Sequence, residues 1–570
     1  TQIWSSMRKL RWPLLIAILG IIAVVALLLT QSSDPAILAP QPVEGGAYSE
    51  ALIGELQRLN PLLDYFNQPD QDIGRLIFSG LVHFDSRGNP HKELAESWSI
   101  SADASLYTIV LREGAVWHDG TPVTSDDVVY TFSKFQDEDY PGPADLHEFW
   151  TEINIIRLDD RRVQFQLPEP FAPFLDYLTT GLLPDHLLRG VSASALIDHP
   201  YNLRPIGTGP YQFDTFIIEE DDIVGVSLVA FEDYYLSRPF LDRIEFRLVP
   251  DSAAAYEAFL NEQVTGISKV DTETLAEVLD NPQLNIHTAR LPHLGILFLN
   301  LENPVKDFLA DKQIRRALML AVNRDWIIQS ALDGQAVLPV GPIMPGTWAF
   351  ADGLQPHPFD PIEAARILDD EEWELTAGAA PGTEEYVRSK EDQLLALELV
   401  HSDDEQSTHI AELVERYWED VGIQVTRIPV PAEDLLTDYL EPREFEVALT
   451  EINYGPYPDP DPYPFWHDSQ KETGQNYAGF DDRNSSIWLE QARTTPDPSR
   501  RADLYASFQY RFQDQLPSLP LYYPVYNFAI DAQIQGVTVG PLFSSSDRFS
   551  TILDWHLMAR RNVQPTEAND

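Results

Sequence analysis

The stretch from Leu394 to Val430 reads LLALELVHSDDEQSTHIAELVERYWEDVGIQVTRIPV and contains one complete unit of an α/β fold. It begins with an apolar run, LLALELV, of the kind that forms a buried strand. The middle of the stretch predicts a helix that ends near Gly422 and has one apolar face, formed by Ile410, Leu413, Val414, Tyr417 and Trp418. A second strand, IQVTRIPV, follows, so the unit is predicted to be two parallel strands joined by a helix.

Strands and helices alternate through residues 290–450, which predicts an α/β lobe there. Before it, short runs rich in β-branched and aromatic residues predict the strands of a mixed α+β lobe: Tyr107 to Leu111, Ile153 to Leu158, Val163 to Leu167 and Ile244 to Val249. Two further segments are expected to be helices, namely Ser125 to Phe135 with its serine as the N-cap, and Asp311 to Ser330 with an apolar face. The polar, acidic segment from Asp369 to Gln393 is expected to be an exposed excursion.

The composition excludes several classes of protein. The 570 residues include 90 acidic and 39 basic side chains, a formal charge of −51, so a general nucleic-acid-binding surface is not expected. Because 44% of the residues are hydrophobic, the chain can form large cores and is not an acidic disordered protein. The absence of cysteine excludes disulfides, thiol catalysis and Cys-ligated zinc.

No motif of an enzyme is present. The sequence has no G-x-S-x-G, no H-E-x-x-H and no Walker A loop, and the glycine-containing segment Gly207 to Tyr211 lacks the lysine of a phosphate-binding loop. The histidines are scattered, without the i, i+4 spacing of a metal site. We therefore predict no catalytic residue, no metal ligand and no cofactor. An extracellular hydrolase acting through a pair of acids stays open as an alternative, because acids are too frequent here to nominate a pair.

Near the start of the chain, residues 13–30 read PLLIAILGIIAVVALLLT and carry no charge. As a helix this segment would be about 27 Å long, close to the thickness of the hydrocarbon layer of a membrane. Arg8, Lys9 and Arg11 precede it, so residues 1–12 are predicted to be cytoplasmic and the rest periplasmic or extracellular. A cleaved secretory signal is the alternative, and it exports the chain equally. Residues 31–46, rich in Pro, Ser and Gly, are expected to be a linker.

The run from Tyr457 to Trp466, YPDPDPYPFW, is unusual. Its prolines fix the backbone and remove hydrogen-bond donors, so it predicts a stiff loop rather than a central strand. The loop presents aromatic rings beside Asp459 and Asp461, an arrangement that suits an extended, partly cationic ligand. An aromatic loop that packs only on its own domain is the alternative.

Many segments, in order, resemble one family. They are Leu59-Asn-Pro61, Leu94-Ala-Glu-Ser-Trp98, Trp117-His-Asp-Gly-Thr-Pro122, Pro205-Ile-Gly-Thr-Gly-Pro-Tyr211, Lys312 to Arg324, Phe359-Asp-Pro361 and Tyr457-Pro-Asp-Pro460. Over about residues 47–545 the chain resembles the extracytoplasmic solute-binding proteins of oligopeptide-type ABC transporters, the peptide/nickel-binding family 5.

The resemblance implies a two-lobed clamshell of the periplasmic-binding-protein type II fold, with an extra domain in the N-terminal lobe. Residues 47–290 would form the N-terminal lobe in two subdomains and 291–515 the second α/β lobe. Residues 516–560 would return to the first lobe, and 561–570 would be a tail. It also implies a monomeric receptor without enzymatic activity, which binds peptides between its lobes and delivers them to ABC permease subunits served by separate ATPase subunits.

The ligand-binding residues that the resemblance implies are Asn453, Tyr454, Gly455, Tyr457 and Asp459. Two positions depart from the pattern. Peptide binders of the family usually have an aspartate, the partner of the ligand's ammonium group, where this chain has Pro456, and commonly a tryptophan where it has Asn453. Either Asp459 or another acid takes that role, or the ligand is not a peptide with a free amine. An oligosaccharide or another non-peptide solute bound by the same fold is the alternative.

Overall fold

The computed structural model describes residues 41–559 apart from residue 384. The predicted anchor at 13–30, the cytoplasmic segment before it, most of the predicted linker and the predicted tail lie outside the described residues. Within the described part, none of the helices combines the length and the apolar character that crossing a membrane requires.

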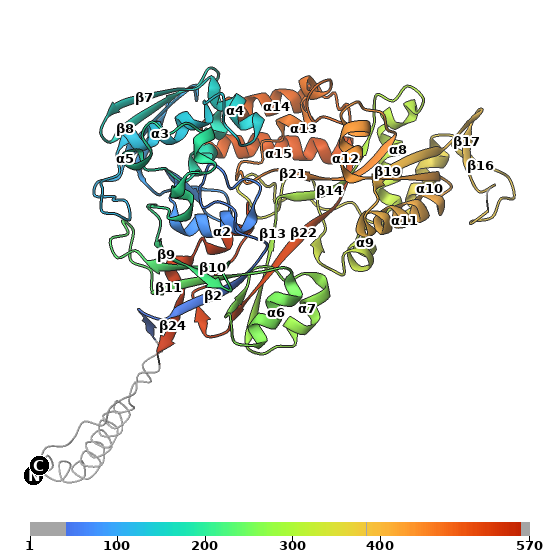
Figure 1. The fold of residues 1–570 in the computed structure, drawn as a ribbon. Coiled ribbons are helices and arrows are strands. Elements are labelled where there is room, and N and C mark those ends of the chain that lie inside the picture. The colour runs from blue at the N-terminus through green and yellow to red at the C-terminus, as the bar shows by residue number, and fades with distance from the viewer. Residues whose placement is uncertain (1–40, 384, 560–570) are drawn as a thin grey trace, which may run out of the picture.

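One large sheet runs through the molecule, in the order β20-β19-β21-β14-β22-β12-β2-β11-β10-β9, and β13 and β15 also pair with β22. Its longest strand, β22 (Ser518–Asp531), belongs to both halves of the protein. The part from Ser518 to Tyr522 pairs with β14, whereas the part from Val525 to Asp531 pairs with β13. Figure 1 shows β22 in the middle of the molecule, between the helices of its two halves. We call the half built on 48–289 and 526–555 the first lobe and the half built on 294–523 the second lobe.

The first lobe combines part of the large sheet with a separate antiparallel sheet. Its part of the large sheet contains β2 (Ala47–Ile53), β9 (Tyr211–Glu219), β10 (Asp222–Ala230), β11 (Arg243–Val249), β12 (Gly266–Ile267) and β13 (Leu284–Arg290). The separate sheet has the order β5-β6-β8-β7, with β5 (Ala95–Ile100), β6 (Leu106–Leu111), β7 (Asn154–Asp159) and β8 (Arg162–Gln166). The strands predicted near residues 107, 153, 163 and 244 are confirmed.

Helices and short strands complete the first lobe. The helices are α2 (Gln68–Ile77), α3 (Ser125–Phe135), α4 (Ala144–Thr151), α5 (Asp185–Leu188), α6 (Ser252–Leu260) and α7 (Thr272–Leu279), with the 3-10 helices η1 (Ala172–Thr179), η2 (Ser194–Leu196), η3 (Pro200–Leu203), η7 (Ser545–Phe549) and η8 (Ile552–Asp554). The short strands are β1 (Gln41–Val43), β3 (Val82–Phe84), β4 (Pro90–Lys92), β23 (Ile534–Gln535) and β24 (His556–Ala559).

In the second lobe, alternate residues of β14 (His293–Leu299) pack into two different hydrophobic cores, because successive side chains of a strand point to opposite faces of the sheet. Leu297 and Leu299 pack with one set of helices, whereas Ile296 and Phe298 pack with the other. The first set is α8 (Lys312–Ala321), α9 (Arg324–Ala331), α10 (Pro361–Asp370) and α11 (Glu405–Glu419); the second includes α14 (Arg483–Thr494) and α15 (Pro498–Gln515). The sheet is therefore covered by helices on both faces.

The remaining elements of the second lobe are β19 (Ala396–Ser402), β20 (Gln424–Val430), β21 (Val447–Asn453), β15 (Ala336–Val337), η4 (Asp307–Ala310), α12 (Ala432–Asp434), the π-helix η5 (Leu435–Leu440), α13 (Tyr463–Trp466) and η6 (Asp468–Gln470). Strands β19 and β20 are parallel and α11 connects them, which confirms the predicted β-α-β unit. The predicted excursion at 369–393 contains a small sheet of β16 (Glu374–Leu375), β17 (Arg388–Lys390) and β18 (Gln393–Leu394).

Two local predictions are wrong. The expected single helix from Asp311 to Ser330 is interrupted, because Val322 is extended and the Asn323 side chain accepts a hydrogen bond from the Trp326 N–H at 3.0 Å, which starts a new helix. Trp326 is consequently 50% exposed. The N-cap of α3 is Thr124 and not Ser125, since Asp127 accepts a hydrogen bond from the Thr124 N–H at 2.8 Å in a capping box.

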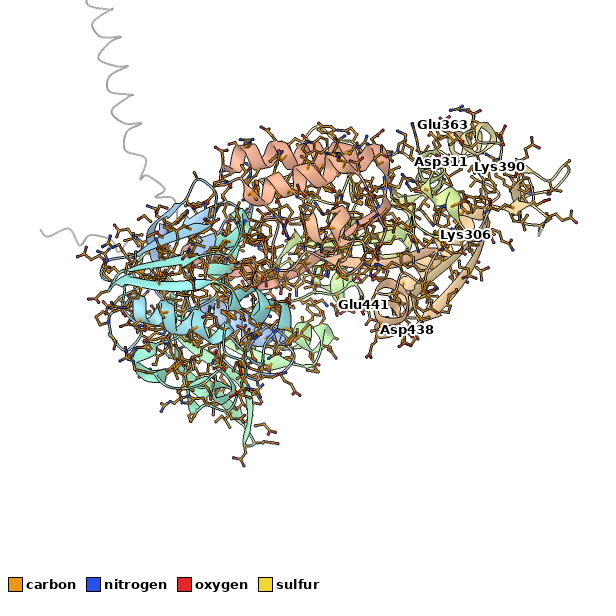
Figure 2. All side chains as sticks on the ribbon, turned by 90° about the horizontal axis from the view of Figure 1, so that it is seen from above. Lys306, Asp311, Glu363, Lys390, Asp438 and Glu441 are labelled. Atoms are coloured by element: carbon orange, nitrogen blue, oxygen red, sulfur yellow. The ribbon has the colours of Figure 1, made fainter. Side chains whose placement is uncertain are left out.

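Charged side chains are spread around the second lobe. Figure 2 shows Asp438 and Glu441 at one edge of this lobe, while Asp311 and Glu363 lie at another. Such a distribution fits an acidic surface that keeps the protein soluble through self-repulsion.

Candidate functional site

The loop that follows β21 leads from the second lobe toward the first. Strand β21 pairs with β14, with Asn453 opposite His293 at its end. The Asn453 side chain then accepts a hydrogen bond from the Gly455 N–H at 2.8 Å, and Gly455 has a φ of +74°, a conformation that favours glycine. This local turn directs residues 456–459 against the first lobe.

The predicted binding residues occupy different environments on this loop. Asn453 is exposed, and Tyr454 packs edge-to-face on Phe465 with ring centroids 5.2 Å apart. Tyr457 stacks on Tyr177 of the first lobe, with a centroid distance of 4.6 Å. The structure thus brings one of the five predicted residues, Tyr457, into an aromatic contact between the lobes.

Asp459, also among the predicted residues, is buried in a polar network that we call the interlobe latch, formed by Asp176, Asp459, Arg501 and Tyr505. The Asp459 N–H donates to Asp176 Oδ2 of the first lobe at 2.7 Å, and its carboxylate accepts from the Tyr505 hydroxyl at 2.8 Å. It also forms an ion pair with Arg501, and the two side chains are 3% and 8% exposed. Asp459 therefore already has a cationic partner within the protein.

Burial raises the pKa of Asp176 to about 8, an effect that the charge of Arg501 opposes and that of Asp461 reinforces. Asp461 has a cation of its own, since Arg493 contacts its carboxylate at 2.6 Å. Both carboxylates of the proline-rich loop are thus occupied by arginines of the second lobe. A further contact joins the lobes beside the latch, where the Trp348 N–H donates to the Arg87 carbonyl oxygen at 2.7 Å.

Next to the latch lies a cavity of about 210 Å³ between the lobes, which we call the first cavity. Pro456 and Pro458 line it from the second lobe. From the first lobe come Asp64 and Tyr65, residues 179–181 at the end of η1 and just after it, and the α2 residues Gln71, Gly74 and Arg75. Phe543, Ser544, Ser546 and Asp547 also line the cavity. The five predicted binding residues are not part of this lining, although two prolines between them are.

Asp64 is the functional candidate that sequence reasoning missed. It precedes α2, where its carbonyl oxygen accepts a hydrogen bond from the Asn67 N–H at 3.0 Å. Burial, reinforced by the charge of Asp70, raises the pKa of the Asp64 carboxyl to about 7. The sequence did carry a weak signal, because Asp64 is the single acid within the otherwise apolar run from Pro61 to Phe66.

A second cavity between the lobes, of about 1090 Å³, is bordered by α7 of the first lobe, by α9 and α11 of the second, and by residues 524–527 of β22. Its charged lining consists of Asp271, Glu273, Asp333 and Glu405 against Lys269, together with His409. This excess of carboxylates favours ligands with positive charge. In the part of the chain that the structure describes, no three His, Asp or Glu side chains are grouped as a metal site would need.

Comparison with known proteins assigns the chain to a protein family. The sequence profile of "Bacterial extracellular solute-binding proteins, family 5 Middle" matches residues 89–475.

Relatives and solved structures agree with the profile. The oligopeptide-binding protein AppA of Bacillus subtilis is 25% identical over 512 residues, which cover 88% of this chain and 91% of AppA. The dipeptide-binding protein of Escherichia coli is 26% identical over 79% of this chain and 84% of its own length. The solved structure of the Bacillus AppA with a nonapeptide superposes with a TM-score of 0.63 at 23% identity, over 91% of this chain and all of that one, and so shares the fold.

Proposed function

Because the chain belongs to family 5 of the bacterial extracellular solute-binding proteins, we propose that it captures peptides between its two lobes and delivers them to an ABC importer. The family consists of solute-binding proteins and not of enzymes, so the hydrolase alternative is set aside. Peptide is the favoured solute because the names of the Bacillus and Escherichia relatives state that those proteins bind peptides.

The observation that carries the proposal is the acidic cavity of about 1090 Å³ between α7, α9 and α11. Its volume slightly exceeds the range of about 300–1000 Å³ that small-molecule sites occupy, so it has room for more than one residue of an extended ligand. Because β22 borders this cavity and belongs to both lobes, a ligand there would touch both lobes and favour the state in which they are close. Its four carboxylates would attract the positively charged side chains of peptides.

Ligand-dependent thermal stabilisation tests the proposal. A ligand that binds only the folded state stabilises it by RT ln(1 + [L]/Kd), about 2.7 kcal/mol at a concentration of 100 Kd. We expect an equimolar mixture of defined tri- to nonapeptides to raise the melting temperature and a mixture of maltooligosaccharides to leave it unchanged. A shift with the oligosaccharides alone would establish the alternative ligand class instead.

We further propose that residues 13–30 anchor the receptor at the outer side of the membrane, where it docks on permease subunits. The support is the uncharged run itself and the basic residues before it. Alkaline extraction of membranes from cells that express the full chain tests the anchor, since an anchored protein stays in the pellet. Release of the full-length protein into the supernatant would contradict the proposed anchor and would leave the proposal of peptide binding untouched.

A further inference from the structure

The ionisable groups of the first cavity differ in their partners. Arg75 and Asp547 form a loose ion pair at 3.9 Å, and the Asp547 carboxylate also accepts hydrogen bonds from the N–H groups of Phe543 and Ser544. Burial and the neighbouring Arg75 charge lower the pKa of His83 to about 4, so this ring is neutral at pH 7. Among the described residues, none other than Asp64 itself, through its own backbone N–H, donates a hydrogen bond to the Asp64 carboxylate, and none forms an ion pair with it. Asp64 is the exception in this cavity.

The surroundings of Asp64 explain why it stays without a partner. The neighbouring acid Asp70 accepts hydrogen bonds from the backbone N–H groups of Gln57 and Arg58, at 2.9 and 2.7 Å. Across the cavity, the second lobe presents Pro456 and Pro458, and proline has no N–H to donate. A half-buried carboxylate without a partner is costly, because burial removes water that the protein does not replace.

We propose that Asp64 is the counter-ion of the α-ammonium group of a bound peptide, with Pro456 and Pro458 closing the site from the second lobe. The assignment rests on the proposed function. One carboxylate matches one monovalent cation, whereas a divalent metal needs six to eight oxygen ligands as Ca²⁺ or octahedral coordination as Mg²⁺. Tyr65 and Phe84 also line the cavity, and aromatic residues are side chains that can attract cations.

Isothermal titration calorimetry with matched ligands tests the assignment. The probes are tri- to nonapeptides with a free amino terminus and the same peptides with an acetylated terminus. The variants are Asp64→Asn, which keeps the shape and removes the charge, and Asp139→Asn, a control at an exposed aspartate for which no hydrogen bond to its carboxylate is found in the described residues. Thermal unfolding of both variants verifies that they are folded.

We expect acetylation to weaken binding to the unchanged protein by about thirtyfold or more, the scale of losing one partner of a buried charge pair. Asp64→Asn is expected to weaken the free-amine peptides by the same factor, to leave the acetylated peptides unchanged, and so to remove the difference between the two ligand sets. Asp139→Asn is expected to bind as the unchanged protein does.

The outcomes separate the two proposals. If peptides bind but Asp64→Asn retains the preference for the free amine, the Asp64 assignment is overturned and the proposed function stands. If no peptide of either set binds the unchanged protein, the proposed function fails, and the Asp64 assignment fails with it.

A pH series gives a second readout. Affinity of the unchanged protein for free-amine peptides is expected to fall about tenfold per pH unit below pH 7, because protonation of Asp64 removes the counter-ion. Asp70 on α2, Tyr65 and Tyr140 interact electrostatically with Asp64, and the other titratable groups that line the cavity are Arg75 on α2, His83 on β3 and Asp547 on η7. His83 titrates near pH 4, outside the range from pH 5.5 to 7.5. Asp64→Asn should bind equally across this range, and an equal slope in both proteins would overturn the assignment.

Discussion

The interlobe latch and the wall of the first cavity treat a buried carboxylate in opposite ways. Asp176 and Asp64 both lie on the first lobe where it meets the second, and burial raises their pKa values to about 8 and about 7. In the latch, Asp176 accepts the Asp459 N–H, and Arg501 supplies a cation. At the cavity wall, the opposite lobe supplies two prolines and no charge. The protein therefore completes one acid site internally, to hold its lobes together, and leaves the other for a ligand.

Removal of the latch cation should have the largest effect. Arg501→Met leaves Asp459 buried beside Asp176 without its positive partner, and breaking a buried ion pair in this way typically costs about 3–5 kcal/mol of unfolding free energy. Urea denaturation measures the loss. Arg500→Met is the matched control, because this neighbouring arginine on α15 is exposed. Equal unfolding free energies of the two variants would mean that the ion pair between Arg501 and Asp459 does not hold the lobes together.

A charge added to the cavity wall should have the next largest effect. Pro456→Asp places a second carboxylate across the first cavity from Asp64, and one additional close charge is expected to tighten the binding of free-amine peptides by about tenfold. Titration calorimetry measures the affinity. Pro456→Asn changes the backbone in the same way without the charge, so it separates the two effects. If both variants bind alike, position 456 does not face the ligand's ammonium group.

The sequence was sufficient for the elements and insufficient for the two acid sites. In residues 394–430 the spacing of the apolar residues shows which side of each strand and of the helix is buried. This spacing can be read within a single segment of the sequence. The break at Val322 was missed because the apolar pattern continues across it, while the decisive contact is the Asn323 cap. Similarly, Asp459 could not be distinguished from a ligand-binding acid, because its partner Arg501 lies 42 positions further along the chain (501 − 459).

The position of Asp64 against Pro456 follows from the packing of the lobes, and no pattern within one segment encodes it. The composition hid it further, because Asp64 is one of 90 acidic residues in the chain. The partners of a buried carboxylate distinguish the two acids: Asp459 pairs with Arg501 and Tyr505, whereas no other residue of the described chain pairs with the Asp64 carboxylate.

The aromatic contact beside the latch should contribute less than its ion pair. Tyr457 and Tyr177 stack with an interplanar angle of 27°, a geometry worth about 0.5–1.5 kcal/mol beyond the area that the rings bury. A double-mutant cycle of Tyr177→Leu and Tyr457→Leu, followed by urea denaturation, isolates this coupling. Tyr510→Leu combined with Tyr457→Leu is the control cycle, with no coupling expected, because Tyr510 on α15 is 52% exposed and no ring contact between Tyr510 and Tyr457 is found in the described residues. A coupling of zero between Tyr177 and Tyr457 would confine the stabilising contact to the latch itself.

In the unliganded protein, the carboxylate of Asp64 at the cavity wall is expected to reduce stability at neutral and alkaline pH. The folded-state pKa of Asp64 is about 7, whereas an unfolded aspartate titrates near about 3.9. Between these pH values the unfolded state has released the Asp64 proton while the folded state keeps it. The free energy of unfolding therefore falls as the pH rises, and the contribution of Asp64 is least favourable above pH 7.

Asp64→Asn removes this titration. Its melting temperature should equal that of the unchanged protein at pH 4 and exceed it by about 1–3 °C at pH 8, in the absence of ligand. Asp139→Asn should show no such divergence, because its carboxylate is exposed. Melting curves recorded at pH 4, 6 and 8 measure the difference. A constant difference at all three values would mean that Asp64 is ionised throughout, with a partner that compensates it, and its contrast with the latch would then disappear.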